Sequence, residues 1–165
     1  MVRGTKSPRR PPRRQGFTLV EAVVLLSIIG ILAAVAAPRF ISVSDMNSAT
    51  AHRQALSDLR FAQRIAAHSG CPVQVDFNSG SYLLRQRSGC RTGAFTQDMA
   101  DPVSNGTPFS VALPSGVTIT SSVDPLIFDA LGRATTESGI VSDVTLSVDG
   151  RPLEASGETG LIRVP

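Results

Sequence analysis

The chain has 165 residues, of which 42% are hydrophobic and 5% aromatic, and its formal net charge is +3. This length fits one small domain beside a terminal segment. Six of the 16 basic residues lie within residues 1–16. The remaining residues hold ten basic and 13 acidic side chains, a net charge of about −3. The positive net charge of the whole chain therefore does not indicate nucleic-acid binding.

Residues 1–16 form a basic stretch without any acidic residue. Lysines and arginines that precede a first apolar segment hold that end of a chain in the cytoplasm. We therefore expect the N-terminus on the cytoplasmic side and everything after the apolar segment on the opposite side of the membrane.

The segment 17–38 is apolar and contains a single charge, Glu21. As a helix it is about 30 Å long, which matches the hydrocarbon core of a bilayer, so we expect a transmembrane helix. A charged side chain at mid-bilayer costs about 2.5–3.5 kcal/mol, so Glu21 is expected to pair with a cation. A secretory signal peptide cut near Ala34-Val35-Ala36 and a plain membrane anchor are the alternatives, and neither explains Glu21.

The run Gly16-Phe17-Thr18-Leu19-Val20-Glu21 with its apolar continuation resembles the prepilin signal of type IV pilins and type II secretion pseudopilins. The resemblance implies that prepilin peptidase removes residues 1–16 by cutting between Gly16 and Phe17 and then methylates the new amine of Phe17. It also implies that Glu21 serves filament assembly by pairing with the N-terminal amine of a neighbouring subunit. The protein would then be a single-pass protein of the cell inner membrane with its C-terminal domain in the periplasm.

Residues 39–70 are expected to continue the helix after a kink at Pro38, because proline removes a backbone hydrogen bond of the helix interior. Apolar residues between Asp45 and Ser69 recur at near-helical spacing, which predicts an amphipathic helix that covers a sheet and ends at Gly70. The expected apolar stripe consists of Met46, Ala49, Arg53, Leu56, Leu59, Ala62, Ile65 and Ala66. Asp58, Arg60 and Arg64 are expected to face water or neighbouring subunits.

Residues 71–165 change to a period of two, which predicts an antiparallel sheet. A hairpin is expected from 72–77 and 81–87 around a turn at 78–80. Further strands are expected at 108–113, 117–121, 126–129, 143–148 and 160–164, and residues 88–107 are expected to form a surface loop. The fold class is therefore α+β, a long N-terminal helix packed on an antiparallel β-sheet domain, and the resemblance above makes this a pilin-like fold.

Cys71 and Cys90 are the two cysteines of the chain, and both fall on the exported side, where a disulfide persists. If the hairpin turns at Ser79-Gly80, Cys71 faces Ser88 and Cys90 lies two residues further on. A disulfide then requires a small bend after Ser88. The alternative is two unpaired thiols.

Residues 58–62 and the run 127–134, Ile-Phe-Asp-Ala-Leu-Gly-Arg-Ala, resemble the GspH/FimT group of minor pseudopilins and pilins. Gly132 is expected to permit a turn and Arg133 to cap or pair locally. Members of the group that bind DNA carry basic residues near the C-terminus, whereas residues 161–165 contain one arginine. Nucleic-acid binding is therefore not expected.

Residues for catalysis or cofactor binding do not stand out in the sequence. It contains no glycine-rich phosphate loop, nucleophile elbow or HExxH motif, so we expect neither an enzyme nor a cofactor. His52 and His68 are interpreted as surface residues of the helix. Asp98, Asp101 and Asn105 in the loop 98–107 offer oxygen ligands for calcium, although such residues are also typical of turns, and no metal site is predicted.

Two functional classes remain. The first is a minor pseudopilin, a structural subunit of the periplasmic pseudopilus of a type II protein secretion system. The second is a FimT-like minor pilin of a type IV pilus, which acts in pilus assembly or DNA uptake. In both, the expected partners are the other pseudopilins or pilins of the filament, prepilin peptidase, the inner-membrane assembly platform and the membrane itself.

Overall fold

The computed structural model of the protein describes residues 18–103 and 108–165, with the backbone but not the side chains of residues 35–42. Gly16 and Phe17 lie outside the described residues. The chain divides into two units, Met1–Ser42 and Val43–Pro165.

Helix α1 (Leu19–Ser69) begins and ends at residues that satisfy its terminal backbone groups. Thr18 is the N-cap: its Oγ1 accepts a hydrogen bond from the N–H of Glu21 at 3.2 Å. At the other end Gly70 adopts a left-handed φ of 68° and donates its N–H to the Ala66 carbonyl. Glycine favours this C-terminal cap because it has no Cβ to clash. The helix thus ends at Ser69, as predicted.

In the first unit, the described side chains of α1 are exposed along residues 19–34. Across the described part of the chain, no helix combines the length and apolarity that a membrane crossing requires. The backbone at Pro38 belongs to α1, and the kink there stays a prediction.

In the second unit, α1 buries a stripe of small residues that differs from the predicted one. The buried positions are Ser48, Ala51, Ala55, Leu59, Ala62 and Ala66. Met46 is 67% exposed and Arg53 is also exposed, so the predicted stripe was wrong at these two positions, whereas Leu56 is half-buried and packs against the core. Small side chains allow closer approach of a helix to its neighbours, and alanine and serine therefore occupy the contact in place of methionine.

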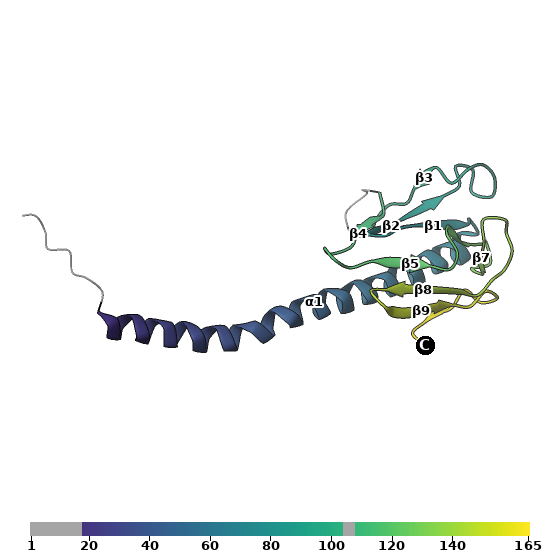
Figure 1. The fold of residues 1–165 in the computed structure, drawn as a ribbon. Helices are drawn as coiled ribbons and strands as arrows, with labels where there is room; N and C mark the ends of the chain where they lie inside the picture. The colour runs from purple at the N-terminus through teal and green to yellow at the C-terminus, as the bar shows by residue number, and fades with distance from the viewer. Residues whose placement is uncertain (1–17, 104–107) are drawn as a thin grey trace, which may run out of the picture. The chain divides into compact units, whose positions relative to one another are not determined.

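The second unit contains two sheets in which all paired strands are antiparallel (Figure 1). The first has the order β3-β2-β1-β6-β7, with β4 also paired to β2, and the second has the order β10-β9-β8-β5. The strands are β1 (Val73–Asn78), β2 (Ser81–Gln86), β3 (Gln97–Asp98), β4 (Ser110–Ala112), β5 (Ile119–Ser121), β6 (Leu126–Phe128), β7 (Ala134–Thr135), β8 (Val144–Val148), β9 (Arg151–Ala155) and β10 (Ile162–Arg163). The α+β fold class is confirmed.

The predicted hairpin is confirmed in its register, because Val73 pairs with Gln86 and Asn78 with Ser81. The surface loop predicted for residues 88–107 was partly wrong, since it contains β3, which pairs with β2. The strands β7 and β9 were not predicted. Strand β1 is displaced by one residue from the predicted range 72–77, and the remaining strands lie within the predicted ranges but are shorter.

The core of the second unit is built from aliphatic side chains around two large aromatic ones, Tyr82 and Phe128, which are 1% and 0% exposed. Tyr82 donates its hydroxyl hydrogen to Asp58 Oδ2 on α1 at 2.6 Å. Asp58 was predicted to face water, and that prediction was wrong: the half-buried carboxylate satisfies a buried tyrosine, which would otherwise lack a partner.

Replacing Asp58 with asparagine should flatten the pH dependence of stability. Burial raises the pKa of Asp58 above 3.8, the Tyr82 hydrogen bond lowers it, and the charge of Asp101 raises it further, with a net upward shift. A carboxyl group whose pKa is higher in the folded chain than in the unfolded chain stabilises the fold at pH values below its unfolded-state pKa. This contribution is lost as the pH rises through the folded-state pKa. Urea unfolding from pH 3 upward should therefore show that the stability of the natural chain declines relative to that of Asp58→Asn as the pH rises, because the other carboxylates titrate alike in both proteins. An equal decline in the variant would contradict the assignment.

Candidate functional site

The N-terminal motif is described from Thr18 onward. Glu21 lies in the first turn of α1, is exposed, and makes no ion pair with a described residue. A carboxylate at this position is favoured by the partial positive charge of the helix N-terminus. Its oxygen atoms are free to accept a cation from another chain. Cleavage and methylation at Gly16 and Phe17 concern residues outside the described range.

Cys71 and Cys90 form a disulfide in the structure, with a Cα–Cα distance of 4.7 Å. The bend after Ser88 is made by Cys90 itself, whose φ of 58° lies in the left-handed region. Arg87 orders the same loop: its guanidinium lies 4.5 Å from the centre of the Phe95 ring and donates Nη1–H to the Gly93 carbonyl at 2.9 Å. The disulfide thus ties an ordered loop to the end of α1.

The run 127–134 forms β6, a tight turn and the start of β7. Asp129 organises the turn: its Oδ1 accepts the N–H groups of Leu131 and Arg133 at 2.9 Å, and its Oδ2 pairs with the Arg133 guanidinium at 2.8 Å. Gly132 has a φ of 78°. The predicted turn at Gly132 and local pairing of Arg133 are confirmed.

Asp129→Ala should lower the free energy of unfolding by about 1–3 kcal/mol at pH 7, since hydrogen bonds to a charged group contribute this much. Burial alone would raise the pKa of Asp129, but the hydrogen bonds from Arg133 and Leu131 lower it by more, so its pKa lies below 3.8. A carboxyl group whose pKa is lower in the folded chain than in the unfolded chain stabilises the fold at pH values above its unfolded-state pKa. This contribution is lost as the pH falls through the folded-state pKa. Denaturant titrations should therefore show the two proteins converging below pH 3.8. Glu137→Ala is the matched control, because Glu137 is exposed and makes no ion pair with a described residue. An equal loss there would contradict the prediction.

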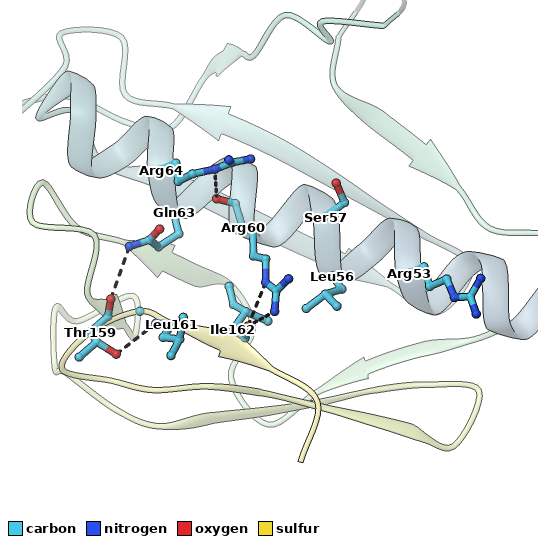
Figure 2. A pocket seen from close by; sticks show the side chains of 10 residues that line it. Arg53, Leu56, Ser57, Arg60, Gln63, Arg64, Thr159, Leu161 and Ile162 are labelled. Carbon is cyan, nitrogen blue, oxygen red and sulfur yellow. Dashed lines mark hydrogen bonds between the residues drawn. The ribbon is translucent and has the colours of Figure 1, made fainter.

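A groove of about 670 Å³ lies between α1 and the C-terminal segment 159–162 (Figure 2). It is lined by Arg53, Leu56, Ser57, Arg60, Gln63, Arg64, Thr159, Gly160, Leu161 and Ile162. Arg60 donates Nε–H and Nη2–H to the Ile162 carbonyl at 3.0 and 2.9 Å, and Gln63 donates to the Thr159 carbonyl at 3.4 Å. These bonds hold the last strand against the helix.

Sequence reasoning missed this groove because its two walls are about a hundred residues apart in the chain. The signal that was available is the spacing of Arg53, Arg60 and Arg64, which places three cations near one side of a helix.

The candidate calcium ligands are not brought together among the described residues. Asp98 pairs with Arg85 at 3.3 Å, Asp101 accepts the Val103 N–H at 2.7 Å, and Asn105 lies outside the described range. In the described part of the chain no group of three or more histidine, cysteine or acidic residues is placed to hold a metal ion. His52 Nε2 lies 3.2 Å from the Pro152 carbonyl.

Comparison with known families finds the prokaryotic N-terminal methylation motif at residues 11–37. Among curated proteins, the type IV major pilin PilA of Myxococcus xanthus is 42% identical over 53 residues, which cover 32% of this chain and 24% of that protein. A major component of the type IV narrow pilus of Thermus thermophilus is 52% identical over 33 residues, covering 20% of this chain and 28% of that protein. The chain thus matches about a quarter of the length of these relatives.

Solved structures resemble a larger part of the chain. The minor pseudopilin EpsH from the type 2 secretion system of Vibrio cholerae matches with a TM-score of 0.54 and 15% identity over 72% of this chain and 96% of that chain. The type IV minor pilin FimU of Pseudomonas aeruginosa matches with a TM-score of 0.50 and 13% identity over 70% of this chain and 86% of that one. The chain therefore joins a prokaryotic N-terminal methylation motif to a fold that is similar to those of EpsH and FimU.

Proposed function

We propose that the protein is a minor pseudopilin, a structural subunit of the periplasmic pseudopilus of a type II protein secretion system. The observation that supports this most is the presence, in one chain, of the methylation motif at residues 11–37 and a fold shared with the pseudopilin EpsH over 72% of the chain.

In this proposal residues 1–16 are a cleaved leader, 17–38 a single inner-membrane span, 39–70 its amphipathic continuation, and 71–165 a periplasmic β-rich domain. Prepilin peptidase cuts between Gly16 and Phe17 and methylates Phe17. Glu21 then accepts the amine of a neighbouring subunit, as its exposed position without an ion pair to a described residue allows. The protein acts through assembly with other pseudopilins on an inner-membrane platform and not as an enzyme.

The second candidate is a type IV pilus minor pilin of the FimT type. It is favoured by the fold shared with FimU and by the identity over 53 and 33 residues with two type IV pilus components. A role in DNA uptake is disfavoured because residues 43–165 hold nine arginines and no lysine against twelve acidic residues. Deletion of the gene should distinguish the two: exoproteins retained in the periplasm support the pseudopilus, and loss of surface pili supports the pilin.

Processing tests the proposal directly. Intact-mass measurement of full-length protein extracted from membranes of a cell with prepilin peptidase should give a chain that begins at methylated Phe17. Gly16→Val should abolish cleavage, because a branched side chain replaces the small residue before the scissile bond, while Gly4→Val in the same leader should not. A chain that begins at Ala37 would show an ordinary signal peptide and overturn the filament subunit.

A further inference from the structure

The groove between α1 and segment 159–162 is cationic in a domain that is net acidic. Three of the nine arginines in residues 43–165, namely Arg53, Arg60 and Arg64, line it, and none of its ten lining residues is acidic. The other six positions of the domain that carry arginine do not line the groove. Positive charge is thus concentrated on one side of one helix.

The charges of these arginines are not neutralised within the described chain. The ion pairs found there use Arg85, Arg133 and Arg163. Arg53 is exposed and makes no hydrogen bond with a described residue, and Arg64 donates Nε–H to the Arg60 carbonyl at 3.3 Å, which leaves its terminal nitrogens free. Arg60 donates Nε–H and Nη2–H to the Ile162 carbonyl and keeps Nη1 for a further acceptor. Because the donors of a guanidinium form a planar fork that matches a carboxylate, Arg53 and the terminal nitrogens of Arg64 can each bind one.

The arginines are spaced for an extended chain. Positions 53, 60 and 64 are separated along the helix axis by about 10 Å and about 6 Å at 1.5 Å per residue. This total is the length of about five residues of extended polypeptide. Figure 2 shows Arg60 directed from α1 to Ile162, with Leu56 on the same side of the helix, while Arg53 and Arg64 lie along the helix.

The walls between the charges are apolar. Leu56 is half-buried, Ile162 is buried, and Leu161 is 60% exposed beside them. A phosphate backbone gains little from such a surface and requires a broad cationic face, which an acidic domain lacks. A peptide that alternates carboxylate and apolar side chains matches both features.

We propose that this groove docks an acidic, partly apolar segment of a neighbouring filament subunit. The inference rests on the proposed function and adds the surface and the chemistry of one subunit contact. Carboxylates of the partner pair with Arg53, Arg60 and Arg64, and its apolar side chains pack on Leu56 and Leu161. Because the arginines are exposed, high salt weakens the contact.

Site-specific photo-crosslinking tests this contact. The full-length protein, with p-benzoylphenylalanine in place of Ser57 on the groove wall, is produced in its own bacterium lacking the natural copy. We expect an adduct with another filament subunit, at a segment containing Asp or Glu. Arg53→Glu and Arg64→Glu should each reduce the adduct at least about fivefold, because like charges across an interface cost several kcal/mol. Arg151→Glu, an exposed position on β9 outside the groove, should leave the yield unchanged.

A second probe separates this inference from the proposed function. The same photo-reactive residue at Leu25, which is exposed on the apolar part of α1, reports filament assembly. Adducts from Leu25 without adducts from Ser57 would overturn the groove contact and leave the filament role standing. An adduct with nucleic acid, or one that is insensitive to both charge reversals, would also overturn it. Absence of adducts at both positions would overturn both proposals.

Discussion

Replacing Cys90 with serine should lower the melting temperature of the protein by roughly 10 °C. The disulfide to Cys71 spans 19 residues, and closing a loop of this size contributes about 3 kcal/mol in the chain-entropy model. For a domain of about 120 residues, each kcal/mol shifts the melting temperature by several degrees. Thermal unfolding of the full-length protein followed by circular dichroism measures the effect.

The reason for so large an effect is the number of elements that meet at the bond. Cys71 follows the last turn of α1 and leads into β1, while Cys90 lies in the loop between β2 and β3. Without the bond, the Arg87 contacts and backbone hydrogen bonds such as Ser88 N–H to the Ala94 carbonyl still order the loop, but none of them ties it to the end of α1. The double variant Cys71→Ser/Cys90→Ser should melt like the single one and should not respond to reductant. A natural chain whose melting temperature is unchanged by reduction would contradict the prediction.

The hairpin and the helix end could be predicted because their signals are local. The turn at Ser79-Gly80 fixes the register of β1 against β2. Gly70 ends α1 because it accepts a left-handed φ. The position of Cys90 relative to Cys71 followed from that register, and the required bend falls on Cys90.

The strand β9 could not be predicted because Pro152 argues against a strand interior. In the structure β10 pairs with β9 only at Glu154 and Ala155, so at Pro152 one side of β9 has no neighbouring strand. Proline is tolerated at such an edge because the missing N–H breaks no ladder bond. This tolerance depends on where β10 begins, which no local pattern reveals.

The buried face of α1 and the groove depend on tertiary contacts. Ser48 is buried because its hydroxyl bonds Asp149 in the turn between β8 and β9, a residue 101 positions away. Hydropathy instead favoured Met46, which is exposed. Arg60 is exposed, as predicted. Its hydrogen bond to the Ile162 carbonyl could not be predicted, because Ile162 is distant in the sequence.

Gly160 lies where three segments approach one another. A Cβ added there would overlap the carbonyl oxygen of Gly132 and come within 3.1 Å of Gln63 Cγ on α1. The N–H of Gly160 donates to the Ser156 carbonyl at 2.7 Å, and its φ of 61° is left-handed. The backbone of the C-terminal segment can therefore pack against the turn at Gly132 only if residue 160 lacks a side chain.

Gly160→Ala should consequently destabilise the protein more than any other glycine-to-alanine change at a turn. A left-handed φ costs a residue with a side chain about 1–3 kcal/mol, and forcing apart packed backbone adds about 1–3 kcal/mol. Gly139→Ala is the matched control, because Gly139 also has a left-handed φ, of 80°, but a Cβ there meets no atom within 4 Å. Urea unfolding should show that Gly160→Ala lowers the free energy of unfolding by at least about 1 kcal/mol more than Gly139→Ala.

Because Thr159, Leu161 and Ile162 line the groove, displacement of the segment around residue 160 should also reduce the yield of the Ser57 photo-adduct. Equal stability losses in the two variants would show that the turn at Gly132 moves to accept the added methyl group without loss of stability. The close approach at residue 160 would then not position the groove.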